Sequence, residues 1–179
     1  MTDSDARDTV NDIFATGLRN AHAMEAQAKQ LLERQVERLD DYPELKDRMR
    51  RHIAETEAQQ TRLEQILRAR SEPTSTLKDA AMSLFGNLAA VAHMPASDEV
   101  LKNSFASFAF ENYETAAYKS LVEVAQLAGA TEAVALLRQS CDEEQAMADW
   151  LEAHLDSVTR RYVTRVTGAA VSTAGAARI

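Results

Sequence analysis

Four long segments of this sequence repeat apolar residues at helical spacing, and they contain almost nothing that would interrupt a helix. They cover roughly residues 7–39, 43–70, 97–128 and 131–158 of the 179. The whole chain has only 5 glycines and 3 prolines, the two residues that most strongly disfavour a helix interior. The apolar positions recur in steps of three and four, as in the buried seam of a helical bundle. The sequence therefore predicts an all-α fold.

The breaks between these segments predict how the helices are connected. The run Asp40-Asp41-Tyr42-Pro43 separates the first two segments, and Gly129 with Thr131 separates the last two; both are short turns. The second and third segments are joined by a long connection with its own short apolar pattern near residues 77–93. Two antiparallel hairpins joined by one long crossover form a ferritin-like four-helix bundle. We expect this bundle to span residues 1–158, followed by a basic tail of small residues at 159–179.

Charge and composition exclude several classes of function. The net charge is −8, which repels phosphate, so nucleic acid is not an expected partner. No apolar run reaches membrane-spanning length, and the polar, acidic residues 1–8 do not resemble a signal peptide. The single cysteine, Cys141, cannot form an internal disulfide. These features together predict a cytoplasmic protein with no membrane association.

Glutamates interrupt the apolar seams near the middle of each long helix. Such positions should be apolar, because glutamate is almost never buried unless it is paired. Glu25 and Glu55 lie at similar distances from the first turn, while Glu114 and Glu144 lie equally far from the second. Glu111 is one turn from Glu114 on the same face. The sequence therefore predicts that these five carboxylates meet at one level of the core.

Buried carboxylates in this number would repel one another unless cations neutralised them. Two divalent ions would nearly balance their charge, and oxygen ligands with one imidazole suit iron or manganese. His52 lies three residues before Glu55 and can face the same site. The predicted metal ligands are Glu25, His52, Glu55, Glu111, Glu114 and Glu144. A bundle without metal, with protonated or hydrated glutamates, is the alternative.

The roles of several other residues near these positions can also be predicted, in some cases with two alternatives. His22 precedes Glu25 by three and is either a ligand or a residue of the helix flank. Tyr118 and Gln59 can hydrogen-bond a ligand carboxylate or pack in the core. Cys141 is most simply a small core residue, and Met147 a packing residue.

Residues 23–27, 52–59, 110–118 and 141–144 closely resemble the YciF-type ferritin-like family of bacterial stress proteins, and the resemblance covers about residues 8–158. The wider rubrerythrin group implies a di-iron or di-manganese site, with Glu-x-x-His motifs on its second and fourth helices. This chain departs from that pattern, because it has His52-x-x-Glu55 on the second helix and Met147 at the matching place on the fourth. With one fewer imidazole, the expected site is weaker, asymmetric or unable to run the full redox cycle.

The resemblance implies two functions of different kinds. One is an oxidoreductase or peroxidase in which two iron or manganese ions react with a small oxidant, oxygen or peroxide, during a stress response. The other is a stress-induced binding or structural homodimer whose metal site is vestigial, stabilising or absent. Iron storage in a cage is a weaker third possibility, since no cage-forming interface is recognisable.

Overall fold

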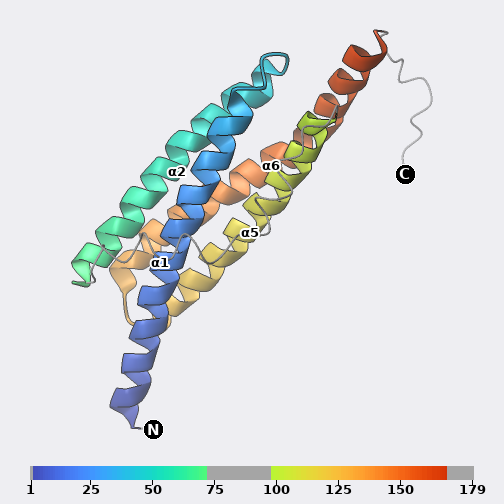
Figure 1. The fold of residues 1–179 in the computed structure, drawn as a ribbon. Coiled ribbons are helices and arrows are strands. Elements are labelled where there is room, and N and C mark those ends of the chain that lie inside the picture. Colours follow the sequence, from blue (N-terminus) through green and yellow to red (C-terminus); the bar gives the residue numbers. More distant parts are fainter. Residues whose placement is uncertain (1, 72–97, 169–179) are drawn as a thin grey trace, which may run out of the picture.

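The computed structural model describes residues 2–71 and 98–168, and all regular structure within these ranges is helical. The helices are α1 (Asp3–Val36), α2 (Pro43–Ala69), α5 (Glu99–Leu127) and α6 (Thr131–Thr167). α1 and α2 form one antiparallel hairpin, and α5 and α6 form a second that packs against it (Figure 1). This arrangement confirms the predicted all-α, ferritin-like four-helix bundle. The short crossover helix predicted near residues 77–93 lies outside the described ranges.

The ends of α1 differ from the prediction by a few residues. Thr2 and Asp5 form a reciprocal capping box: the Thr2 hydroxyl accepts from the Asp5 amide, and the Asp5 carboxylate accepts from the Thr2 amide. This box starts α1 at Asp3 instead of Arg7. α1 ends at Val36, so the buried Leu39 belongs to the turn and not to the helix. α2 begins at Pro43 as predicted, since proline suits the first helical position.

The second hairpin turns at Gly129, whose φ of +68° lies in the left-handed region that favours glycine. Thr131, predicted as the N-cap, is the first residue of α6, and Ala130 occupies the cap position. For α5, Asp98 is the N-cap, and the predicted cap Ser97 lies outside the described ranges.

α6 is longer than its apolar pattern indicated. We expected the helix to end near Val158, but it continues to Thr167 and stops at Gly168, which has a φ of +66°. Val158 is buried and Tyr162 packs against the same apolar cluster, while Arg165 forms an ion pair of 2.5 Å with Asp41. Contact with the α1–α2 turn therefore extends the helix into the predicted tail, and residues 169–179 lie outside the described part.

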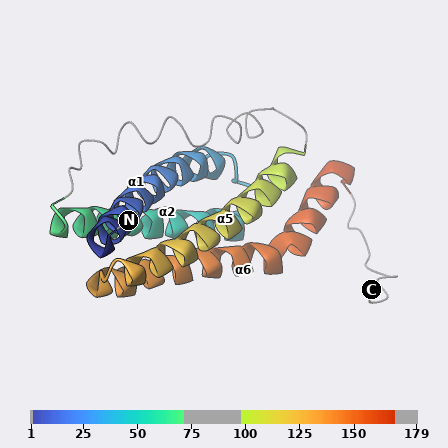
Figure 2. The ribbon, with the colours of Figure 1, turned by 90° about the horizontal axis from the view of Figure 1, so that it is seen from below.

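Two apolar clusters fill the bundle on either side of a polar layer. Along α2, Met49 belongs to one cluster and Leu63 to the other; along α6, Met147 and Cys141 are divided in the same way. The residues between them include the buried His52 on α2, together with buried glutamates on the other three helices. Figure 2 shows the α1–α2 hairpin lying over the α5–α6 hairpin, so this layer is enclosed between the two.

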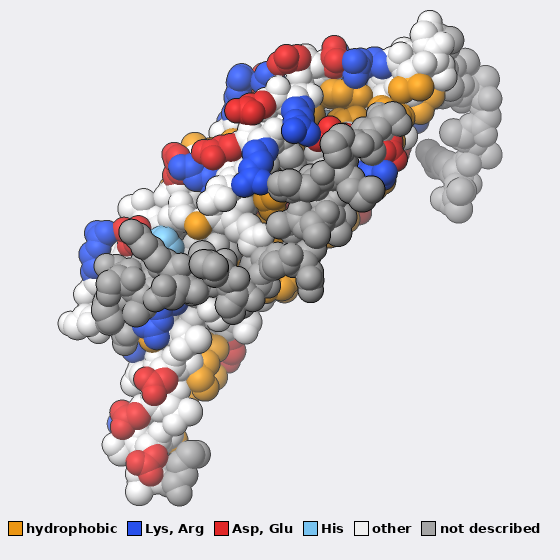
Figure 3. Space-filling model, viewed as in Figure 1, with side chains coloured by type: hydrophobic (Ala, Val, Ile, Leu, Met, Phe, Trp, Pro, Cys, Tyr) orange, Lys and Arg blue, Asp and Glu red, His pale blue; other side chains and the backbone are white. Residues whose placement is uncertain are grey.

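Charged side chains of both signs are interspersed along the face seen in Figure 3. Some of them connect helices, as in the 2.6 Å contact between Lys29 on α1 and Glu57 on α2. Among the described helices, none combines the length and the low polarity needed to cross a membrane.

Candidate metal centre

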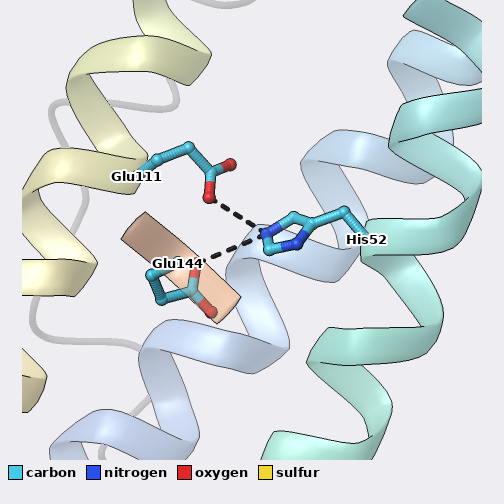
Figure 4. Close-up of side chains that lie close together, drawn as sticks. All are labelled: His52, Glu111 and Glu144. Carbon is cyan, nitrogen blue, oxygen red and sulfur yellow. Dashed lines mark ion pairs between the residues drawn. The ribbon is translucent and has the colours of Figure 1, made fainter. Parts of the chain in front are cut away.

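Three helices bring one imidazole and two carboxylates together in the polar layer. His52 extends from α2, Glu111 from α5 and Glu144 from α6, and all three are buried. Nε2 of His52 lies 3.0 Å from Oε2 of Glu111 and 3.3 Å from Oε2 of Glu144 (Figure 4). One ligand atom from each residue lies within 4.8 Å of the other two. This group could hold a metal ion.

The three converging atoms also lack hydrogen bonds to the residues that the structure describes. Nε2 of His52, Oε2 of Glu111 and Oε2 of Glu144 are all buried and make no hydrogen bond within the described part of the chain. Both contacts are ion pairs when the imidazole is protonated, although neither meets the geometry of a hydrogen bond. Buried polar atoms are almost always paired. Nitrogen and oxygen donors that face one point without hydrogen bonds fit a divalent transition metal.

Glu25 and Glu114 extend this set of unpaired atoms. Both side chains are completely buried, and Oε2 of Glu25 and both oxygens of Glu114 lack a hydrogen bond among the described residues. Burial raises the pKa of each carboxyl well above its usual value, and the negative charge of Glu144 raises both further. These side chains therefore form an all-oxygen region that adjoins Glu144.

The electrostatics of Glu111 and His52 are linked. Burial raises the pKa of Glu111 to about 7, although the positive charge of His52 opposes this rise. Burial alone would lower the pKa of His52, but the charge of Glu111 and the contacts with Glu144 and Glu55 outweigh it and raise that pKa well above its usual value. Without metal, the site therefore holds protons that a cation must displace.

The structure does not bring Glu55 into this cluster. Its Oε2 accepts hydrogen bonds from Nδ1 of His52 at 2.7 Å and from Nη1 of Arg48 at 3.0 Å, and one third of the side chain is exposed. Burial raises the pKa of Glu55, but hydrogen bonds from His52 and Arg48 outweigh this and lower it. Glu55 thus contacts the imidazole on the side opposite Glu111 and Glu144, where it fixes the tautomer and orientation of the ring.

Two other side chains donate hydrogen bonds to Glu25 and Glu144. The Tyr118 hydroxyl donates to Oε1 of Glu25 at 2.7 Å, and Nε2 of Gln59 donates to Oε1 of Glu144. In both cases one oxygen is engaged by the protein and the other is left facing the polar layer. The sequence suggested that Tyr118 and Gln59 either hydrogen-bond one of the buried glutamates or pack in the core; in the structure both donate to such a glutamate.

The remaining candidates lie away from the cluster. His22 is partly buried and its Nε2 lies 3.3 Å from Oε1 of Glu64. Met147 is fully buried in an apolar cluster. The Cys141 thiol donates to the backbone oxygen of Thr115 at 3.7 Å, and burial raises its pKa. Neither His22 nor Met147 belongs to the group whose ligand atoms converge.

Sequence reasoning missed Arg62 and Glu143, which form an ion pair beside Glu144. One signal was available: Arg62 lies three residues after Gln59, so it continues the polar stripe of α2 at a position facing α6. Glu143 directly precedes Glu144 and gave no signal of its own, because neighbouring helical residues point in different directions.

Known proteins share this fold and sequence pattern. A family profile described as "Domain of unknown function (DUF892)" matches residues 9–164. A structure from Xanthomonas campestris pv. campestris has 27% identity and a TM-score of 0.74, covering 88% of this chain and 99% of its own. YcfI from Rhodopseudomonas palustris has 23% identity and a TM-score of 0.66, covering 80% and 92%. The E. coli stress protein YciF has 21% identity and a TM-score of 0.66, covering 84% and 96%.

These matches confirm the predicted resemblance to the YciF-type family. The family profile includes every residue of the candidate metal centre, from Glu25 to Glu144.

Proposed function

This chain belongs to the DUF892 family, and we propose that its core binds two iron or manganese ions that react with oxygen or peroxide. The observation that carries the proposal is the convergence of His52, Glu111 and Glu144 through buried atoms that lack hydrogen bonds among the described residues. Such atoms destabilise a folded protein unless a ligand satisfies them.

The donor atoms divide into two halves that share Glu144. His52, Glu111 and Oε2 of Glu144 would hold one ion, and Glu25, Glu114 and the same oxygen of Glu144 would hold the other. The four glutamates of this set are all buried; their negative charges would match the positive charges of two divalent ions. Imidazole and carboxylate ligands suit iron and manganese. Bound iron or manganese would supply the electrons for reduction of the oxidant.

The protein's own residues would prepare the site. Glu55 would hold His52 through Nδ1 and so keep Nε2 free for the metal. Tyr118 and Gln59 would keep Glu25 and Glu144 oriented. The apolar clusters on either side exclude bulk water from the polar layer, which strengthens the electrostatic interactions within it.

A metal-dependent structural role is the second candidate. It is favoured by the small number of imidazoles: His52 is the only histidine of the three-residue group, and Met147 is buried in an apolar cluster. A metal in such a site would stabilise the bundle, and the predicted homodimer, without turning over an oxidant.

Anaerobic titration of the metal-free protein with ferrous iron tests the proposal. We expect two equivalents per chain in the native protein and one or fewer in Glu114→Gln. Glu123→Gln is the matched control, because Glu123 lies on the same helix and is exposed. Failure of the native protein to bind iron would overturn both candidates. Binding without any consumption of peroxide or oxygen would favour the structural role over the enzymatic one.

A further inference from the structure

Beyond the candidate ligands, α2 and α6 are joined by a buried polar network. We call it the α2–α6 clasp, and its members are Gln59, Arg62, Ser140 and Glu143. Nη2 of Arg62 lies 2.7 and 2.8 Å from the two oxygens of Glu143, and Nη1 donates to the Ser140 hydroxyl at 2.6 Å. The Arg62 side chain is only 10% exposed and that of Glu143 21%. An ion pair this enclosed keeps its strength, because solvent screens it little.

Gln59 connects the clasp to the candidate site. Its amide nitrogen donates one hydrogen bond to Oε2 of Glu143 at 3.1 Å and another to Oε1 of Glu144. An amide group has two N–H donors and one oxygen, so both donors are used on consecutive carboxylates of α6. The reverse orientation would set the amide oxygen against two negative groups. Glu143 therefore fixes the orientation of Gln59, and Arg62 balances the charge of Glu143.

The hydrogen bond from Gln59 leaves the two oxygens of Glu144 in different environments. Oε1 of Glu144 is engaged by Gln59, while Oε2 faces His52 at 3.3 Å without a hydrogen bond among the described residues. A free glutamate can chelate an ion through both oxygens or rotate between binding modes. Here the hydrogen bond from α2 removes that freedom.

We infer that Gln59, held in place by the Arg62–Glu143 ion pair, is a positioning residue that restricts Glu144 to one donor oxygen toward the metal. This inference rests on the proposed function and adds residues that are not themselves ligands. Outer partners of metal ligands typically contribute about 10- to 100-fold in metal affinity. The clasp also joins the two hairpins at the level of the site, so metal affinity depends on how α2 and α6 are held together.

Cobalt(II) is the probe for the test, since its visible absorption depends on the number and arrangement of its ligands. Gln59→Met keeps a side chain of similar length but removes both donors. We expect it to weaken cobalt binding by about 10-fold or more and to change the absorption of the bound ion, because Oε1 of Glu144 is released. Glu143→Gln should weaken binding less. Glu57→Gln is the control, since Glu57 pairs with Lys29 across α1 and α2 and its side chain is half exposed.

The double variant separates positioning from a general effect of charge or stability. If Glu143 acts through Gln59, then Glu143→Gln should have no further effect on cobalt affinity in the Gln59→Met background. An equal effect in both backgrounds would contradict the inference, as would native affinity and absorption in Gln59→Met. Should Gln59→Met not fold, a native absorption spectrum in Glu143→Gln would contradict it instead. Absence of cobalt binding by the native protein would overturn the proposed function itself, which is a distinguishable result.

Discussion

Nε2 of His52 lies 3.0 Å from Oε2 of Glu111, yet neither atom makes a hydrogen bond within the described part of the chain. The other ring nitrogen of His52 is satisfied by Glu55 at 2.7 Å. The imidazole is therefore hydrogen-bonded through Nδ1, while among the described residues Nε2 makes only ion-pair contacts with Glu111 and Glu144. A metal-binding histidine typically has this arrangement, in which one ring nitrogen is hydrogen-bonded to the protein and the other faces the metal.

Replacement of His52 should remove most of the affinity at one half of the site. We expect His52→Gln to weaken the binding of one Mn(II) ion by at least about 10- to 100-fold, the range seen when even an outer partner of a metal ligand is lost. The electron paramagnetic resonance signal of free Mn(II) during a titration measures this. His154→Gln is the control, because His154 stacks on Trp150 and hydrogen-bonds its backbone oxygen. Equal Mn(II) binding by native protein and His52→Gln would remove His52 from the ligand set.

The metal-free protein should lose stability as the pH rises. The pKa values of Glu25, Glu111, Glu114 and His52 are all raised in the folded state, to about 7 for Glu111. Each group therefore binds its proton more tightly when folded, so its contribution to stability is complete below its unfolded pKa and is lost through its folded pKa. Urea denaturation at a series of pH values should give a free energy of unfolding that falls between about pH 5 and pH 8. A rise over this interval would contradict the account.

Glu114→Gln should stabilise the metal-free protein while it abolishes binding at the all-oxygen half. The native carboxyl is completely buried, and neither oxygen has a hydrogen bond among the residues described. A neutral amide avoids the cost of burying a charge, so the free energy of unfolding should rise by on the order of 1–2 kcal/mol. Denaturation of metal-free Glu114→Gln and of the exposed control Glu123→Gln measures the effect. A loss of stability in Glu114→Gln would show that the glutamate is satisfied without metal.

Tyr118→Phe tests whether the Tyr118 hydroxyl orients the Glu25 carboxylate. The hydroxyl donates to Oε1 of Glu25 at 2.7 Å, and both side chains are fully buried. Loss of this hydrogen bond should lower the free energy of unfolding by about 1–2 kcal/mol and leave both oxygens of Glu25 free to rotate. Iron affinity should fall in the same variant. Unchanged affinity would mean that Tyr118 only packs in the core.

The sequence could predict the burial of four glutamates because helix geometry is regular. They are Glu25, Glu111, Glu114 and Glu144. The repeat and the rise per residue of a helix are fixed, so the seam and the distance from each turn locate a side chain in the bundle. All four are buried as those two quantities indicate. The helical hairpins could be predicted for the same reason, together with the proline and glycine at their turns.

Helix geometry could not predict the orientation of the Glu55 side chain. Glu55 is next to Thr56, and either residue fits the edge of the seam on α2; the structure buries Thr56 and turns Glu55 toward Arg48. The Arg62–Glu143 pair was missed because it joins residues 81 positions apart. The polar stripe of α2 indicates that Arg62 faces α6 but does not identify its partner. The continuation of α6 beyond Val158 likewise depends on contact with the distant α1–α2 turn.

The most direct measurement is anomalous X-ray diffraction from crystals of the protein loaded with Mn(II) without oxygen. The account predicts one anomalous peak bounded by Nε2 of His52, Oε2 of Glu111 and Oε2 of Glu144, and a second between Glu25, Glu114 and Glu144. Glu55 should remain hydrogen-bonded to the imidazole and outside both coordination shells. Crystals that bind Mn(II) only at the protein surface, with no anomalous peak in the core, would contradict the central claim.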